Sequence, residues 1–419
     1  MAKNYKFYLG GKWVSRKAKL DVFSPWDDKL IGRVSLGSAD DLTAAITAAQ
    51  KTFPKMKALP SYKRAEICMQ ISEAIARDKQ KFARMMALEV GKSLKDSLGE
   101  VNRAIDVFRI SAEEAKRIGG EIMDLDWAPG MDGRMGLIRR FPIGVVAGIS
   151  PFNFPLNLVA HKIGPAIASG NCIVVKPAPK TPIMALMLAE LIHKTDLPKG
   201  AVSVVPTTNE DAAPLIEDER VKLISFTGSD KVGWWLKERA GKKKVVLELG
   251  GNAGCAIADD ADLDYATDRL VVGSFGVAGQ SCISVQRIFV QEKVYNKFIK
   301  LFVAKTKKLK VGNPLDKKTD VGTMVSRVAV ENTLAAVNQA IKDGAKLLVG
   351  GKAQGAVFYP TILTNVTKKM DVCSKELFAP VTTVDTYKTF PEVVKKINDS
   401  AFGLQAGIFT NRMNDIMTA

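Results

Sequence analysis

A cysteine in a small, polar setting is a candidate nucleophile in this 419-residue sequence. Cys282 lies in the run Gly-Gln-Ser-Cys-Ile-Ser at 279–284. A nucleophilic cysteine must be accessible and stabilised as thiolate, and small flanking residues allow backbone N–H groups to approach it. The alternative for this window alone is an unreactive, packed cysteine. His161 and His193 both fall in helical patterns, so activation by a carboxylate or by backbone dipoles is favoured over a Cys–His dyad.

A carboxylate at the end of an apolar run is a candidate general base. Glu248 lies in Val-Val-Leu-Glu-Leu-Gly-Gly-Asn at 245–252, which has the pattern of a buried strand. Burying a carboxylate is costly unless it is paired or functional. We expect burial to bring this carboxyl into the range useful for proton abstraction at neutral pH. An interior ion pair is the alternative.

Two further segments join a strand to a helix and carry polar groups. Asn153, in Ser-Pro-Phe-Asn-Phe-Pro at 150–155, has a neutral amide that could donate to an oxyanion. An N-cap or a turn at the helix start is the alternative for this asparagine. Phe226–Ser229, with Gly233 following, could present backbone N–H groups to a pyrophosphate. A glycine pair alone is a weak signal.

The elements that must position these residues alternate along the chain. Predicted strands are Ile143–Ile149, Cys172–Lys176, Val202–Val205, Leu223–Thr227 and Val245–Leu249, and predicted helices are Leu156–Ser169, Ile183–Lys194 and Lys231–Ala240. This alternation is typical of βαβ units and a parallel sheet. Ligands of such sheets bind beyond the carboxyl ends of the strands. Four segments follow strand ends: 150–155, 176–181, 226–233 and 248–252.

The remainder of the chain falls into three further parts. Residues 39–117 show helical spacing of apolar residues, and 121–140 changes to Gly, Pro, Asp and Arg, which indicates an excursion such as a hairpin. A second α/β stretch begins near Ala256. Its predicted strands are Gln286–Val290 and Val381–Thr386, and its predicted helices are Val294–Thr306 and Ala329–Asp343. We place a domain boundary near Gly250–Ala253.

Composition limits the classes of function. The net charge of +17 permits an anionic partner, but the Lys and Arg residues are interleaved with Asp and Glu, which favours a solvated basic surface over nucleic-acid binding. Five scattered cysteines without CxxC spacing argue against a disulfide framework or a zinc site, and for a reducing compartment. No signal sequence or membrane-spanning stretch is visible. We expect a soluble cytoplasmic protein without a metal site or a membrane partner.

Five motifs occur together in an order and spacing that resemble the aldehyde dehydrogenase superfamily. They are Pro-Phe-Asn-Phe-Pro at 151–155, Lys-Ile-Gly-Pro-Ala-Ile-Ala-Ser-Gly-Asn at 162–171, Leu-Glu-Leu-Gly-Gly-Asn at 247–252, Gly-Gln-Ser-Cys at 279–282 and Glu-Leu-Phe-Ala-Pro-Val at 376–381. The resemblance runs from Tyr8 to Thr410. It implies a discontinuous Rossmann-like cofactor-binding domain (1–120 and 141–250), an oligomerisation hairpin (121–140) and an α/β catalytic domain (251–419).

The resemblance implies oxidation of an aldehyde to a carboxylic acid with NAD or NADP. Cys282 would attack the aldehyde carbon, and the Asn153 amide with the Cys282 backbone N–H would stabilise the oxyanion. Hydride transfer to the nicotinamide would leave a thioester, which water activated by Glu248 would hydrolyse. Lys162 matches a lysine near the active site of the family.

The resemblance also implies the cofactor contacts. Lys176 would bond the adenosine ribose, Glu376 the nicotinamide ribose, and Gly228, Ser229 and Gly233 would adjoin the pyrophosphate. Phe378 would pack beside the nicotinamide, with Phe152 near it.

Two departures from the family pattern matter. Many NAD-preferring members carry Glu three residues after the strand-end lysine, whereas this chain has Pro179 followed by Lys180. This predicts that NADP is accepted. The chain also stops at Ala419, where members typically continue, so we expect a truncated oligomerisation element. A homodimer or homotetramer is implied by the family, and a catalytically impaired or non-enzymatic relative is the competing hypothesis.

The remaining expectations concern the reaction and substrate. A CoA-acylating relative is disfavoured because Glu248 is present, whereas acylating members often lack that base. The Ser-Cys-Ile-Ser setting at 281–284 and Arg287 resemble relatives acting on small hydroxyaldehydes, semialdehydes or phosphorylated trioses. A small hydroxyaldehyde such as lactaldehyde is favoured by resemblance only.

Overall fold

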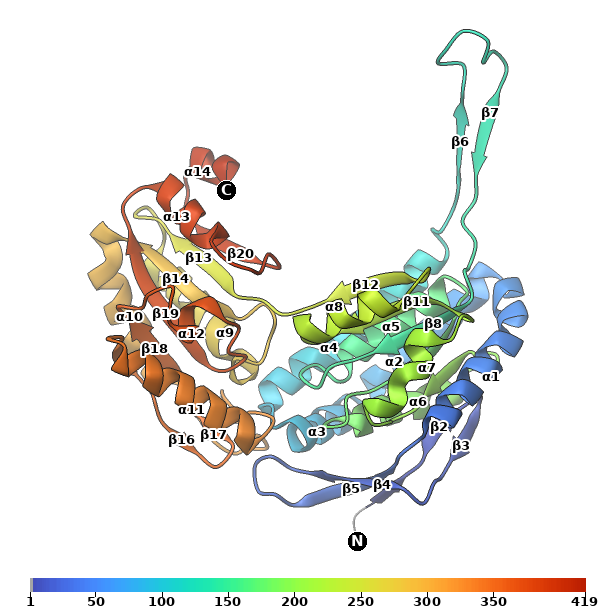
Figure 1. The fold of residues 1–419 in the computed structure, drawn as a ribbon, viewed down its shortest axis with the longest axis horizontal. Coiled ribbons are helices and arrows are strands. Elements are labelled where there is room, and N and C mark those ends of the chain that lie inside the picture. Colours follow the sequence, from blue (N-terminus) through green and yellow to red (C-terminus); the bar gives the residue numbers. More distant parts are fainter. Residues whose placement is uncertain (1–2) are drawn as a thin grey trace.

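The computed structural model describes residues 3–419 and shows two α/β lobes, each built on its own sheet, with a long hairpin extending from one of them (Figure 1). The lobe that contains the N-terminus is built mainly from residues before 250. The lobe that contains the C-terminus begins at 253. Each lobe has its own hydrophobic core.

The first lobe contains a seven-stranded sheet in the order β12-β11-β8-β9-β10-β2-β3. The strands are β2 (Phe7–Leu9), β3 (Lys12–Val14), β8 (Val145–Ile149), β9 (Cys172–Lys176), β10 (Val202–Val204), β11 (Val221–Thr227) and β12 (Lys244–Glu248). The run from β12 to β10 is parallel, and β2 and β3 add an antiparallel edge. β8, β9 and β10 are buried almost throughout, as expected of parallel strands covered on both faces.

Helices cover this sheet and supply much of its core. They are α1 (Ala39–Ala58), α2 (Ser61–Arg77), α3 (Lys79–Val90), α4 (Leu94–Ala115), α5 (Asn157–Ala168), α6 (Pro182–His193), α7 (Ala213–Glu217) and α8 (Asp230–Arg239), with a short 3₁₀ turn η1 (Glu210–Ala212) before α7. α6 is apolar on nearly every side and is buried at ten positions, which is typical of a helix enclosed between a sheet and other helices.

Two smaller sheets lie outside this layer. β1 (Lys3–Tyr5), β5 (Leu30–Ser35) and β4 (Lys19–Phe23) form a three-stranded sheet near the N-terminus. β6 (Glu121–Asp124) and β7 (Met135–Ile138) pair only with each other and project away from the lobe as a hairpin (Figure 1). This hairpin is the excursion expected for 121–140.

The second lobe has a six-stranded sheet in the order β15-β18-β19-β14-β13-β20. Its strands are β13 (Ala253–Ile257), β14 (Val285–Gln291), β15 (Lys346–Val349), β18 (Thr361–Thr364), β19 (Val381–Tyr387) and β20 (Ala406–Phe409), with a separate pair β16 (Ala353–Gln354) and β17 (Val357–Phe358). Its helices are α9 (Leu263–Phe275), α10 (Tyr295–Lys307), α11 (Arg327–Lys342), α12 (Asp371–Ser374), α13 (Phe390–Asn398) and α14 (Met413–Thr418), with 3₁₀ turns η2 (Gly276–Gly279) and η3 (Glu292–Val294).

Every strand and helix predicted from the alternation is present, and most differ from the structure by one or two residues at an end. The largest differences are two residues at the start of β8, β11 and α11. β8 begins at Val145 rather than Ile143 because Gly144 has φ +127°, outside the extended region. The five short N-terminal strands β1 to β5 were not predicted. Three of them have only three residues, too few for an alternating pattern to register.

Candidate active site

Four loops lie at one edge of the first sheet, where the parallel strands β8, β9, β11 and β12 end. They are the segments 150–155, 176–181, 226–233 and 248–252 that the sequence predicted. The segment 248–252 continues directly into β13 of the second lobe. This edge therefore adjoins both lobes.

Cys282 comes from the second lobe, in the loop between η2 and β14, and is half-buried. The preceding turn is unusual because Val277, Ala278 and Gly279 all have left-handed φ, at 56°, 52° and 67°. A valine in this conformation is strained, and such strain persists only where the surroundings enforce it. The backbone N–H of Val277 donates to Asp96 Oδ2 at 3.0 Å, so α4 of the first lobe helps to hold this turn.

The 250–251 glycines allow a close approach between the two lobes. A Cβ on Gly251 would lie 2.0 Å from the carbonyl oxygen of Cys282, so only glycine fits beside the nucleophile loop. The Gly251 N–H donates to Glu376 Oε1 at 2.7 Å, and a Cβ on Gly250 would meet the other oxygen of that carboxylate at 2.5 Å. Glu376 is thus packed against both glycines, and the backbone of Cys282 is packed against Gly251.

Asn153 is buried and its side chain reaches the nucleophile loop. Its Nδ2 donates to the carbonyl oxygen of Gln280 at 2.9 Å, and its Oδ1 is buried without a partner among the described residues. The capping alternative is wrong, since α5 begins at Asn157 and Leu156 is its N-cap residue. The amide has a second N–H hydrogen, which remains available for an oxyanion near Cys282.

Glu248 is exposed, and the expected burial is wrong. The reason is that β12 is the edge strand of its sheet and alternates between exposed and half-buried side chains, with Glu248 on the exposed face. Its charge is still close enough to Cys282 to raise the pKa of that thiol. A solvated carboxylate beside the cysteine has direct access to water.

Lys162, from α5, is nine-tenths or more buried beneath this edge. Its Nζ donates to Thr227 Oγ1 at 2.9 Å and to Ser225 Oγ at 3.1 Å, so it fixes the end of β11. Burial lowers the pKa of Lys162 to about 8, and the charge of Glu248 opposes this shift. Lys162 therefore holds the end of β11, which pairs with the end of β12 at Glu248.

Lys176 ends β9 and is buried with its Nζ 3.0 Å from Asn209 Oδ1. Burial lowers the pKa of Lys176 to about 8, and the charge of Glu210 opposes this shift. Pro179 is half-buried in the turn that follows, and Lys180 is exposed. The ammonium has donors to spare for a sugar hydroxyl.

The start of α8 is the free helix N-terminus at this edge. Ser229 is the N-cap residue and makes no side-chain capping bond, so the backbone N–H groups of the first turn remain available to donate to a ligand. A Cβ on Gly233 would lie 2.3 Å from Leu249, which explains why glycine stands there. The N–H of Gly228 is already used, because it donates to the carbonyl oxygen of Glu248 at 3.0 Å.

Phe152 and Phe378 meet across the two lobes. Their ring centroids are 5.7 Å apart at an interplanar angle of 77°, an edge-to-face contact. Phe378 has φ 52°, a strained conformation for an aromatic residue. The structure thus brings these two expected cofactor-site residues together.

Burial raises the pKa of the Cys282 thiol, and the charges of Glu376 and Glu248 raise it further. Backbone N–H groups of Cys282 and Ile283 act in the opposite direction. Burial and these two charges therefore favour the neutral thiol, and the backbone N–H groups favour the thiolate. A cationic neighbour would be needed to favour the thiolate.

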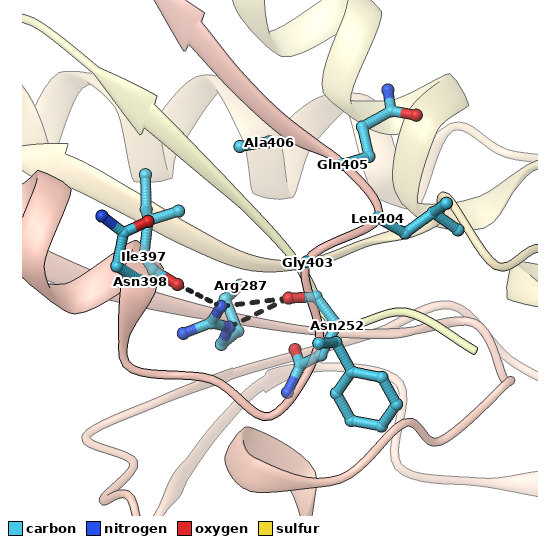
Figure 2. Close-up of a pocket in the computed structure, with 9 residues that line it drawn as sticks. Asn252, Arg287, Ile397, Asn398, Gly403, Leu404, Gln405 and Ala406 are labelled. Atoms are coloured by element: carbon cyan, nitrogen blue, oxygen red, sulfur yellow. Dashed lines mark hydrogen bonds between the residues drawn. The ribbon is translucent and has the colours of Figure 1, made fainter. Parts of the chain in front are cut away.

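A pocket of about 430 Å³, shown in Figure 2, is lined by none of the residues Cys282, Asn153, Glu248 and Glu376. It is lined by Asn252, Arg287, the end of α13 and residues 402–406. The Arg287 guanidinium donates to the carbonyl oxygens of Asn252 and Ile397 at 3.0–3.2 Å (Figure 2). It also donates to the Lys396 carbonyl oxygen at 3.0 Å. Arg287 therefore ties α13 to the loop at 252.

Several residues that shape the site had no sequence signal. Gln280 accepts from Asn153 through its carbonyl, and its side chain bonds Val325 and Thr323, yet a glutamine beside a cysteine indicates nothing by itself. Glu210 lies 34 residues after Lys176 in sequence, so only the fold shows that they are neighbours. Burial of a glutamate in a helical stretch, as at Glu100, could not be read from the pattern.

A family model described as the aldehyde dehydrogenase family matches residues 13–419. The chain belongs to this family. The match includes the loops that carry Asn153, Glu248, Cys282 and Glu376. The resemblance seen in the sequence motifs is therefore confirmed.

Relatives and solved structures agree with the family assignment. The chain is 42% identical over 418 residues to a 3-sulfolactaldehyde dehydrogenase of Priestia megaterium, covering all of this chain and 87% of that protein. It is 41% identical over 412 residues to a lactaldehyde dehydrogenase of Methanocaldococcus jannaschii, covering 97% and 87%. The crystal structure of aldehyde dehydrogenase 21 from Physcomitrella patens, in complex with the reaction product succinate, superposes with a TM-score of 0.98 at 43% identity, covering 100% and 88%.

The protein is an aldehyde-oxidising oxidoreductase with the aldehyde dehydrogenase fold, and its family uses NAD or NADP. Within residues 3–419, no helix is long and apolar enough to cross a membrane. Over the same range, no group of three or more His, Cys, Asp or Glu side chains is arranged to hold a metal ion.

Proposed function

We propose that the protein oxidises a small hydroxyaldehyde or semialdehyde to its carboxylic acid with NAD(P)⁺, using Cys282 as nucleophile and Glu248 as general base. The observation that carries this proposal is the hydrogen bond from Asn153 to Gln280, which brings an oxyanion donor to the loop of Cys282. The nucleophile, the donor amide and the carboxylate come from three segments that meet only in the folded chain.

Cys282 acts through its sulfur. The thiolate attacks the aldehyde carbon and forms a thiohemiacetal, while the free N–H of the Asn153 amide and the Cys282 backbone N–H stabilise the oxygen anion. Loss of hydride from this carbon gives a thioester on Cys282. Asn153 is held for this task, because its other N–H is engaged at 2.9 Å.

Glu248 then removes a proton from water, and the resulting hydroxide attacks the thioester and releases the carboxylic acid. Exposure suits this role because a solvent-exposed carboxylate can exchange protons directly with water. Its charge acts on the pKa of both Cys282 and Lys162, which supports a position near the nucleophile.

The residues present fit a dinucleotide. When bound, NAD(P)⁺ supplies the hydride acceptor for this chemistry. Lys176 has spare donors for the adenosine ribose, and Glu376 keeps one carboxylate oxygen free of the Gly251 bond for the other ribose. The first turn of α8 after Ser229 offers N–H groups for the pyrophosphate, whereas the N–H of Gly233 already donates to the Ser229 carbonyl oxygen at 2.9 Å. The Phe152–Phe378 contact forms an aromatic wall for the nicotinamide. The other two helix N-termini at this edge cannot serve, because Glu89 and Glu100 already cap α6 and α5.

We infer that NADP is accepted at least as well as NAD. Pro179 cannot bond a 2′-hydroxyl or repel a 2′-phosphate, and Lys180 adds a positive charge to the same turn. The Glu210 carboxylate lies in a different loop, and its charge raises the pKa of Lys176 against the effect of burial. Its exposure lets it turn away from a phosphate.

The names of the relatives and one cation support this substrate class. The names of two relatives specify 2-hydroxyaldehydes, one of them sulfonated, and a related structure contains the dicarboxylate succinate. Phe154 directly follows Asn153 in the chain, and the Arg103 guanidinium lies over its ring, 5.4 Å from the centroid. A cation there favours an aldehyde that carries a hydroxyl or an anionic group.

We also propose a role for each segment of the chain. We assign cofactor binding to residues 1–120 and 141–250, catalysis to 251–419, and assembly of a homodimer or homotetramer to the hairpin 121–140. Ile122, Trp127, Met135 and Leu137 of that hairpin are exposed apolar side chains, as expected of strands that pair with another subunit. All five cysteines are free, which fits a reducing compartment such as the cytoplasm.

One assay tests the proposal and separates it from a catalytically impaired relative. The purified protein is incubated with lactaldehyde, 3-sulfolactaldehyde, succinic semialdehyde or acetaldehyde, each with NAD or NADP, and with or without CoA. We expect reduced cofactor and free acid with at least one hydroxylated or anionic aldehyde, at a rate that does not depend on CoA. Acyl-CoA as the product would contradict hydrolysis by Glu248, and no turnover with any pair would favour the impaired relative.

A further inference from the structure

The junction between α3 and α4 contains two fully buried charges that the chemistry above does not use. The side chains of Lys92 and Glu100 are 1% and 0% exposed and form an ion pair with each other. Removing two charges from water costs several kcal/mol per ion, and a hydrophobic pair of similar volume is often equally stable. A reason other than stability is therefore required for their presence.

The contacts of the pair lead to the Asn153 loop. One oxygen of Glu100 bonds Lys92, and the other accepts from the backbone N–H groups of Leu156 and Asn157 at 2.9 and 3.0 Å. These N–H groups begin α5, so the carboxylate also meets the positive end of the helix. The Lys92 ammonium lies 3.8 Å from the centroid of the Phe154 ring. The pair therefore holds residues 154–157 by both ring and backbone.

Asn153 is attached directly to this held segment. Residues 150–156 form neither strand nor helix, so anchoring contacts set the position of the loop. The Lys92–Glu100 pair anchors the end of the loop, the bond to the Gln280 carbonyl anchors it at Asn153, and the Ser150 N–H, which donates to the Lys176 carbonyl at 3.1 Å, anchors its start. A shift of about 1 Å in a reacting group can lower a rate about a hundredfold.

The same junction also fixes the nucleophile side. Asp96, between the two charged residues, accepts from Val277 in the strained turn before Cys282. Gly91 accepts from the Thr323 N–H at 2.9 Å, and Thr323 in turn receives a bond from Gln280. The ten-residue stretch 91–100 thus contacts both the donor loop of the first lobe and the nucleophile loop of the second lobe.

We propose that Lys92 and Glu100 are positioning residues that set the Asn153 amide against the thiohemiacetal oxygen on Cys282. This inference rests on the proposed role of Asn153. The pair acts through Asn153 and touches neither substrate nor cofactor. Removing the pair is expected to lower the acylation rate only in a protein whose Asn153 amide is present.

A double-mutant cycle tests this dependence. The first-turnover rate of NAD(P)H formation is measured by rapid mixing for the unmodified protein, Glu100→Gln, Asn153→Ala and the double variant. We expect Glu100→Gln to slow the first turnover about tenfold or more with cofactor affinity changed less than about twofold. In the Asn153→Ala background, the same substitution should change the rate by less than about twofold.

Two further variants keep the test decisive if Glu100→Gln does not fold. Phe154→Leu removes the ring beneath the ammonium without leaving a buried charge unpaired, and it should show the same dependence on Asn153. Glu89→Gln is the matched control, because Glu89 is an equally buried carboxylate that caps α6 instead, accepting from Ile183 and Met184 at 2.6 and 3.1 Å. Its effect should be the same in both Asn153 backgrounds.

The outcomes separate the two proposals. Equal rate factors for Glu100→Gln, and for Phe154→Leu, in both backgrounds would overturn the positioning role while leaving that of Asn153 intact. Full first-turnover activity of Asn153→Ala would instead overturn the role of Asn153 in the proposed function.

Discussion

The side chain of Asn153 and the backbone of Gln280 are joined by a 2.9 Å hydrogen bond that crosses from the first lobe to the second. Gln280 is two residues before Cys282, so this hydrogen bond and two residues of backbone connect the Asn153 amide to the Cys282 thiol. One N–H of the amide is committed to this bond, and the other remains free. The bond locks the donor in one orientation before any aldehyde arrives.

Replacement of Cys282 by alanine is expected to abolish turnover and leave cofactor binding nearly intact, since Cys282 makes the only covalent bond to substrate. NAD(P)H formation is followed by absorbance, and cofactor affinity by fluorescence titration. Cys373→Ala is the matched control, because Cys373 is also a half-buried free cysteine. Substantial NAD(P)H production by Cys282→Ala would show that another group is the nucleophile.

Glu248→Gln is expected to spare the first hydride transfer and impair thioester hydrolysis. Rapid-mixing measurements should show a burst of about one reduced cofactor per site and then slow turnover. Glu238→Gln, an exposed glutamate on α8, serves as the control and should give normal steady-state rates. A normal steady-state rate without a burst for Glu248→Gln would mean that a different group activates water.

The alkylation of Cys282 should depend on pH in a direction set by its environment. Burial first, and the charges of Glu376 and Glu248 next, raise the pKa of this thiol. A raised pKa means less thiolate at neutral pH, so the rate of iodoacetamide reaction in cofactor-free protein should still be rising where an ordinary cysteine has reached its plateau. Glu376→Gln should move the profile to lower pH, but only in part, because burial is the larger cause. A profile centred below that of a model thiol would contradict this account.

Cofactor preference is expected to be governed by the turn after Lys176. We expect kcat/KM for NADP to be at least equal to that for NAD. Pro179→Glu should shift the preference toward NAD by about tenfold or more, or ~1.4 kcal/mol, because the new carboxylate would repel a 2′-phosphate and accept from a 2′-hydroxyl. A large preference of the unmodified protein for NAD would show that Pro179 does not control this choice.

Glu210 offers a complementary test of the same site. Its charge acts on Lys176 from another loop. Glu210→Gln should shift preference further toward NADP if that carboxylate faces the 2′ position, and Glu219→Gln, an exposed glutamate farther along the chain, should leave the ratio unchanged. An unchanged ratio for Glu210→Gln would leave the turn at 179–180 as the determinant.

The sequence by itself determined the alternating strands and helices between 143 and 249 and the four loops at one sheet edge. Strands such as Cys172–Lys176 are short apolar runs ended by turn residues, and that local pattern is enough to place them. Because parallel strands end at one edge, the residues after β8, β9, β11 and β12 had to be neighbours. The motifs supplied the family in the same way.

Only the tertiary structure decided how the side chains at this edge are placed. Glu248 is exposed because β12 is an edge strand of its sheet. The residues of a strand do not by themselves indicate its position in the sheet. Lys92 and Glu100 are buried because α4 packs against α5, which lies far away in sequence. The partner of Asn153 is a carbonyl 127 residues away, since such contacts depend on the packing of two lobes.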